Sequence, residues 1–168
     1  RGYTDLNFII PEMIHEIIYR KGSYYPDVGD FSGARSASIY TRSQTTPNRI
    51  QLGAGEFGYV RALLTGNKEN FEGNLTFGFE HQAYEGPWDS VDEDVGKTNI
   101  QLKQSWERDS GQFILSLMAC ENKWNSADQI PHRAVRSGLI SKFGSIDPTS
   151  GGESSRYSLS LALDSDLG

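Results

Sequence analysis

The sequence is poor in several features, and each shortage excludes a class of protein. The 168 residues contain one cysteine, Cys120, so a framework of intrachain disulfides is excluded. No apolar run approaches the roughly 18 residues that a membrane-spanning helix needs. The net charge is −6 and no basic stripe occurs, which argues against a nucleic-acid partner. The mean hydropathy of −0.53 still allows a membrane protein built of strands, because alternating strands average out.

Catalytic and metal-binding motifs are also missing. The sequence contains no Gly-x-Ser-x-Gly nucleophile motif and no phosphate-binding loop. With a single cysteine, three scattered histidines do not give the spacing of a metal site; they are His15, His81 and His132. We therefore predict no catalytic residues, no metal and no cofactor, and we do not expect an enzyme.

Acidic residues allow two further hypotheses, both weak. A run of carboxylates could hold Ca²⁺, but its spacing matches no EF-hand loop, and a solvated loop explains it; these residues are Asp89, Asp92, Glu93 and Asp94. Glu80 and Glu107 could form the carboxylate pair of a β-rich glycoside hydrolase. Two carboxylates on different strands need no catalytic role, so this alternative is the weaker one.

The clearest pattern that is present lies in residues 74–88, NLTFGFEHQAYEGPW. Leu75, Phe77 and Phe79 fall on one side of an extended chain, and the polar Thr76 and Glu80 fall on the other. Successive side chains of a strand point to opposite faces, so this alternation predicts a two-faced strand. A length of about 9–11 residues is typical of a strand that is tilted across a bilayer.

The same pattern recurs through the second part of the chain. From Asn48 onward we predict strands only, in a mainly β fold, and the 18 glycines and 11% aromatic residues suit turn-rich β structure. The expected strands are residues 48–54, 59–65, 74–82, 100–107, 113–122 and 157–163. We expect Cys120 to be buried or to face the polar side, because it lies on such an alternating strand.

The expected connections differ in length between the two ends of these strands. Residues 86–97 and 125–152 form long loops at one end, whereas 66–73 and 108–111 form short turns at the other. Outer-membrane barrels show this asymmetry, and they also place aromatic residues near strand ends, as this sequence does. A soluble sandwich can show the same polar outer faces, so it remains the alternative.

Residues 1–45 differ from the rest and predict a small mixed α/β unit. Pro11 suits the first turn of a short helix. Residues 15–22 and 36–41 read as strands, and 23–31 as a loop between them. The polar stretch 43–47 reads as a linker.

The order of these segments resembles a known family. Ile10-Pro11 precedes a strand at 16–22, a glycine follows at Gly29, and a second strand at 36–41 leads into the alternating segments. This order is similar to the end of the plug domain and the start of the barrel in TonB-dependent outer-membrane receptors. Asp128-Gln129-Ile130-Pro131 and the Tyr84–Trp88 stretch are similar to one branch of them.

The resemblance implies a fold and a function. Residues 1–45 would be the C-terminal part of a plug domain. Residues 46–168 would be the first six or so strands of a large antiparallel transmembrane β-barrel, of about 22 strands in this class. The chain begins without Met and ends directly after a strand pattern, so we expect a piece of a longer receptor.

Such a receptor lies in the outer membrane of a Gram-negative bacterium and is surrounded by its lipid. It would take up a scarce small-molecule ligand actively, as a siderophore-iron complex, cobalamin or a carbohydrate. Its partner would be the energy-transducing protein TonB, whose contact box is not in this stretch. The alternative from the residues alone is a soluble β-sandwich module that binds carbohydrate.

Five residues are expected to contact the ligand if the resemblance holds; they are Tyr24, Tyr25, Asp27, Trp88 and Trp124. The first three lie where plugs present an apical loop, although they could also pack against the barrel wall. The two tryptophans could line the outer mouth or anchor the barrel at the interface. On the central strand, a charge at Phe77 is expected to block assembly and a charge at Thr76 to be tolerated.

Overall fold

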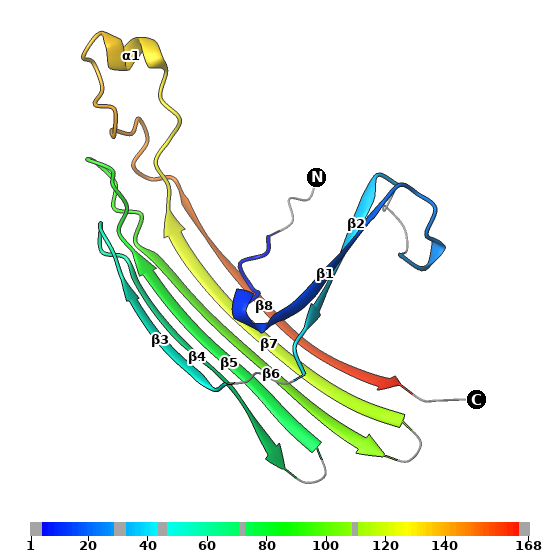
Figure 1. Ribbon diagram of the computed structural model, residues 1–168. Coiled ribbons are helices and arrows are strands. Elements are labelled where there is room, and N and C mark those ends of the chain that lie inside the picture. The colour runs from blue at the N-terminus through cyan, green and yellow to red at the C-terminus, as the bar shows by residue number, and fades with distance from the viewer. Residues whose placement is uncertain (1–4, 29–32, 44–46, 71–72, 109–110, 165–168) are drawn as a thin grey trace.

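The chain forms two units of antiparallel strands (Figure 1). The computed structural model describes residues 5–28, 33–43, 47–70, 73–108 and 111–164. We call residues 5–43 the N-terminal unit, and the six-stranded remainder the main sheet. The predicted linker 43–47, the loop motif that contains Gly29, and the tips of the turns 66–73 and 108–111 lie partly or wholly outside the described residues.

The N-terminal unit is a two-stranded hairpin with two short turns of 3₁₀-helix. Its elements are η1 (Pro11–Met13), β1 (Ile14–Lys21), η2 (Pro26–Val28) and β2 (Arg35–Thr41). Pro11 begins η1, as predicted, because proline fixes φ and needs no backbone partner there. The prediction of an α-helix in this unit is wrong, however, because the only helical turns in residues 5–28 and 33–43 are of the 3₁₀ type.

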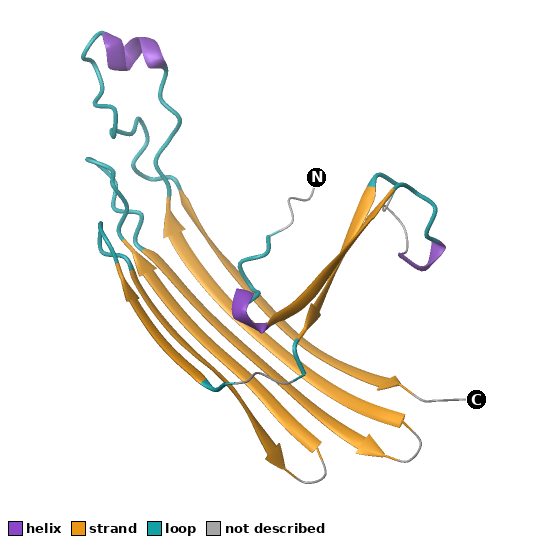
Figure 2. Ribbon diagram, viewed as in Figure 1, coloured by secondary structure: helices purple, strands orange, loops and turns teal. Residues whose placement is uncertain are grey.

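The main sheet confirms the prediction of a mainly β, antiparallel fold. It consists of β3 (Arg49–Ala54), β4 (Val60–Asn70), β5 (Gly73–Tyr84), β6 (Val95–Arg108), β7 (Gly111–Asn125) and β8 (Gly151–Asp164). Each strand pairs with the next in sequence order. Figure 2 shows the six strands as one curved layer, with the N-terminal hairpin on its concave side.

The structure lengthens several predicted strands. Residues 66–70 continue β4 instead of turning, because Asn67 and Glu69 pair in register with Thr76 and Asn74. Likewise β6 begins at Val95 and β8 at Gly151, inside the segments predicted as loops. Backbone hydrogen bonds between strands do not require apolar side chains, so the polar ends of these strands show no alternation of apolar and polar residues.

The long connection between β7 and β8 holds one short helix, α1 (His132–Arg136), so the prediction of strands only is wrong there. No helix in the described part of the chain is long and apolar enough to cross a membrane.

The two faces of the main sheet differ sharply. On β5, Thr76 and Glu80 point to the concave side and are 0% and 1% exposed, whereas Phe79 points to the convex side and is 39% exposed. The register carries this alternation across all six strands. Exposed apolar side chains line the convex face; they are Ile50, Leu52, Val60, Leu64, Phe79, Ile100, Leu102, Leu117, Tyr157, Leu159, Leu161 and Leu163.

Candidate functional site: the concave face and its outer cavity

Side chains of the concave face hold the backbone of the N-terminal unit. Asn99 Nδ2 donates a hydrogen bond of 2.7 Å to the carbonyl oxygen of Asn7, and Gln101 Nε2 donates one of 3.1 Å to that of Phe8. Three further donors reach carbonyls at the end of β2 and just after it: Lys103 bonds to Thr41, and Asn74 and Thr76 bond to Ser43. Side chains of the main sheet therefore hydrogen-bond to main-chain atoms at both ends of the N-terminal unit.

A small buried apolar cluster joins the two units; it consists of Ile10, Met13 and Leu63. Gly78 of β5 lies beneath it, and a Cβ atom at that position would come within 3.0 Å of Ile10 Cδ1. The glycine thus leaves room for the side chains of Ile10 and Met13 to pack closely on the sheet.

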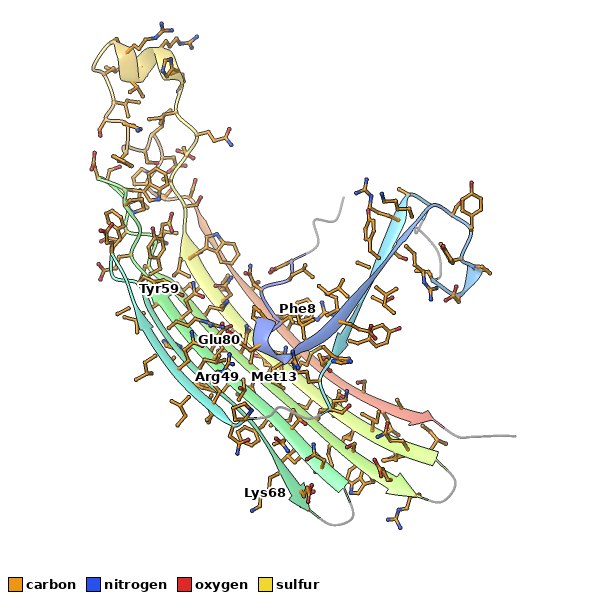
Figure 3. All side chains as sticks on the ribbon, viewed as in Figure 1. Phe8, Met13, Arg49, Tyr59, Lys68 and Glu80 are labelled. Atoms are coloured by element: carbon orange, nitrogen blue, oxygen red, sulfur yellow. The ribbon has the colours of Figure 1, made fainter. Side chains whose placement is uncertain are left out.

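A charged network completes the interface beside this cluster. Arg61 of β4 makes a two-pronged contact with Glu12 of η1, at 2.7 and 2.8 Å between nitrogen and oxygen atoms. Its Nε also donates to Glu80 Oε1 at 2.7 Å. The second oxygen of Glu80 accepts from Asn99 Nδ2 at 2.9 Å and lies 3.2 Å from Lys97 Nζ. Figure 3 shows Glu80, Met13 and Phe8 together on this concave side.

The network is balanced in charge. Glu12 and Glu80 offset Arg61 and Lys97, and all four side chains are at most 22% exposed. The hydrogen bond from Arg61 holds the pKa of Glu12 below its usual value, so Glu12 is charged and paired at neutral pH. Two-pronged guanidinium contacts are directional, and this one fixes η1 on β4.

The structure argues against one expectation and one weak alternative for the concave face. A charged residue at position 76 is not expected to fit, because the side chain of Thr76 is fully buried and bonds to the carbonyl oxygen of Ser43. Glu80 and Glu107 do not form a catalytic pair. Glu80 is paired with Asn99, and Glu107 lies eight residues further along β6, about 26 Å away at roughly 3.3 Å per residue. A glycosidase needs its carboxyl groups within about 10 Å of each other.

A cavity of about 560 Å³ opens between the start of the N-terminal unit and those ends of β5, β6 and β7 that lead into the long loops. Trp124 is its aromatic wall, and its polar lining includes Asp5, Gln82, Glu93, Lys97 and Asn122. Glu93 is held in place by a 2.5 Å hydrogen bond from Trp88 Nε1. The volume lies in the range of small-molecule sites, about 300–1,000 Å³. We call this the outer cavity.

No family model, no curated protein and no solved structure matches the chain. Function is therefore inferred from the two faces of the sheet and from the outer cavity.

The predicted ligand-contact residues fall in different places. Trp124 lines the outer cavity. Trp88 lies behind it, bonded to Glu93, with its ring centre 6.3 Å from that of Phe143. The remaining three residues lie on the loop between β1 and β2, which Figure 1 shows at the end of the hairpin away from the loops of the main sheet; they are Tyr24, Tyr25 and Asp27.

That hairpin loop has an organisation that the sequence did not reveal. Arg20 pairs with Asp27 at 2.7 Å and lies 5.0 Å from the centre of the Tyr25 ring. The hydrogen bond from Arg20 holds the pKa of Asp27 below its usual range. Tyr24 is left 84% exposed. Asp27 and Tyr25 thus both contact Arg20, whereas Tyr24 is the most exposed of the three predicted residues.

The acidic loop serves a structural purpose. Asp89 accepts a hydrogen bond from Ser141, and the Asp92 carbonyl accepts one from Asn125, so the two long loops pack on one another. Among the described residues, no three His, Cys, Asp or Glu side chains come together as metal ligands would. Cys120 is buried, as predicted, and points to the concave side.

Proposed function

We propose that the chain is the late plug and first barrel strands of a TonB-dependent outer-membrane transporter, which actively takes up a scarce small molecule. One observation carries this proposal: the N-terminal unit covers the polar face of the main sheet and leaves the apolar face exposed. The apolar face would meet lipid, and the polar face would line the lumen in which the plug sits.

A soluble sandwich would show the opposite arrangement. Its second layer covers the apolar face, because burial of apolar surface is what holds the two sheets together. Here Leu52 and Leu161 are 79% and 63% exposed, whereas Asn99 and Gln101 are buried under the N-terminal unit. Twelve large apolar side chains on one face exceed the patches that soluble monomers usually expose.

The position of the apolar residues along the strands also favours a tilted barrel wall. The convex apolar row is centred on residue 62 in β4 and on residue 160 in β8. The register leads from Ser160 back to β4 through Ser116, Lys103, Thr76 and Asn67. The band is thus displaced by five residues over four strand steps, mostly between β4 and β6. With about 3.3 Å per residue and about 4.8 Å between strands, the mean tilt is about 40°, as in membrane barrels.

The contact between the units suits a plug that has to move. It includes many hydrogen bonds and ion pairs, which water can replace, and the buried apolar cluster within it consists of Ile10, Met13 and Leu63. A plug pulled by TonB must leave the wall without a large loss of apolar burial. In the described sheet, β3 and β8 are each paired on one side only, and closure of a barrel would pair both edges.

Fractionation of cells that express the full-length protein tests the proposal. We expect the protein in the outer-membrane fraction, released only by detergent, and we expect it to bind the purified periplasmic domain of TonB. Recovery in the soluble fraction without detergent would contradict the proposal and would favour the soluble β-sandwich module.

A further inference from the structure

We propose that the outer cavity binds a neutral, hydroxyl-rich ligand, that is a saccharide, with Trp124 as its stacking surface. This inference rests on the proposed function, because it names the class of solute that the transporter would carry. It follows from three properties of the cavity: the setting of its tryptophan, the hydrogen-bond acceptors in its lining, and its charge.

The position of the Trp124 indole depends on the lack of a side chain at Gly152. Trp124 pairs with Gly152 of β8, and a Cβ atom at residue 152 would come within 2.8 Å of Trp124 Cζ2. The ring therefore occupies the space above Gly152 on the concave side of the sheet. Indole faces carry negative potential and attract the slightly positive C–H groups of a sugar ring.

The polar lining offers several hydrogen-bond acceptors. The Oδ1 atom of Asn122 is buried and has no hydrogen-bond partner among the described residues. Asp5 and Glu93 add two carboxylates to the lining. A buried acceptor without a partner is costly, and a ligand that supplies O–H donors removes that cost. Saccharide hydroxyl groups supply such donors, whereas anionic chelates supply few.

The charge of the cavity points the same way. Its lining carries two carboxylates and one cation, Lys97, whose charge is already paired with Glu80 at 3.2 Å. The two carboxylates repel an anionic ferric complex, which would require a cluster of free basic groups. A ligand with many hydroxyl groups and no negative charge avoids that repulsion.

The test is binding of the detergent-purified full-length protein to an array of neutral, acidic and amine-bearing glycans, with ferric citrate as the anionic chelate. We expect at least one neutral glycan to bind. Trp124→Ala should weaken that binding at least tenfold, and Gly152→Val should do so as well, by displacing the indole. Trp124→Phe should retain most of the affinity, because it keeps an aromatic face.

Trp106→Ala is the matched control, because Trp106 packs on Phe113 on the other face and near the opposite end of the sheet. It should leave glycan binding unchanged. Failure of all glycans to bind, binding of ferric citrate instead, or equal losses at Trp124 and Trp106 would overturn the inference. A membrane-inserted protein that binds no glycan contradicts this inference alone, whereas a soluble protein that binds one contradicts the proposed function alone.

Discussion

Replacing Leu161 with lysine is expected to abolish assembly in the outer membrane, whereas the same change at the neighbouring Ser160 should leave assembly intact. Both residues are exposed and lie side by side on β8, but Leu161 points to the convex face and Ser160 to the concave face. A lysine on the lipid face of a barrel costs about 2–4 kcal/mol near the bilayer midplane. A lysine at Ser160 would reach the aqueous lumen.

The measurement is the amount of folded protein in outer membranes, read from the heat-dependent shift in gel mobility of unboiled samples. Ser160→Lys is a sharper control than a change at Thr76, which is buried under the N-terminal unit and would disturb that contact. If both lysine variants assemble equally well, the convex face does not meet lipid.

Replacing Arg61 with alanine is expected to free the N-terminal unit from the sheet. Arg61 is shared by Glu12 and Glu80, and its loss leaves two carboxylates with a single cation, Lys97. Removal of one partner from a buried ion pair typically costs about 3–5 kcal/mol. This corresponds to an increase of about 100-fold or more in the population of the detached state.

Hydrogen exchange of residues 7–14 in the full-length protein reports this detachment. We expect faster exchange there in Arg61→Ala, and little change in Arg20→Ala, whose ion pair with Asp27 is exposed to solvent. Equal exchange of residues 7–14 in the Arg61 variant and the unaltered protein would mean that the network does not hold η1 in place.

The faces of the main sheet could be predicted from the sequence because a strand has a period of two. Leu75, Phe77 and Phe79 share one side for that reason alone, and no tertiary contact is needed to place them. The same rule placed Cys120 on the polar side.

Contacts between distant segments could not be predicted. Arg61 and Glu12 are 49 residues apart, and nothing in either segment marks them as partners. The local pattern gives Trp88 and Trp124 equal standing, yet only Trp124 lines the cavity, because Gly152 leaves room for its ring. The sequence predicts a turn at the polar end of β4 and a loop at that of β6, whereas ladder pairing continues there without apolar alternation.

We propose that the convex face of the main sheet meets lipid, while the concave face meets water and the N-terminal unit. Spin labels placed singly at residues 157–163 of β8, in the full-length protein in liposomes, test it directly. We predict that collisions with oxygen, which dissolves in lipid, peak at the odd-numbered residues. Collisions with a water-soluble nickel chelate should peak at the even-numbered ones. Access of the nickel chelate to both sets alike would contradict the claim.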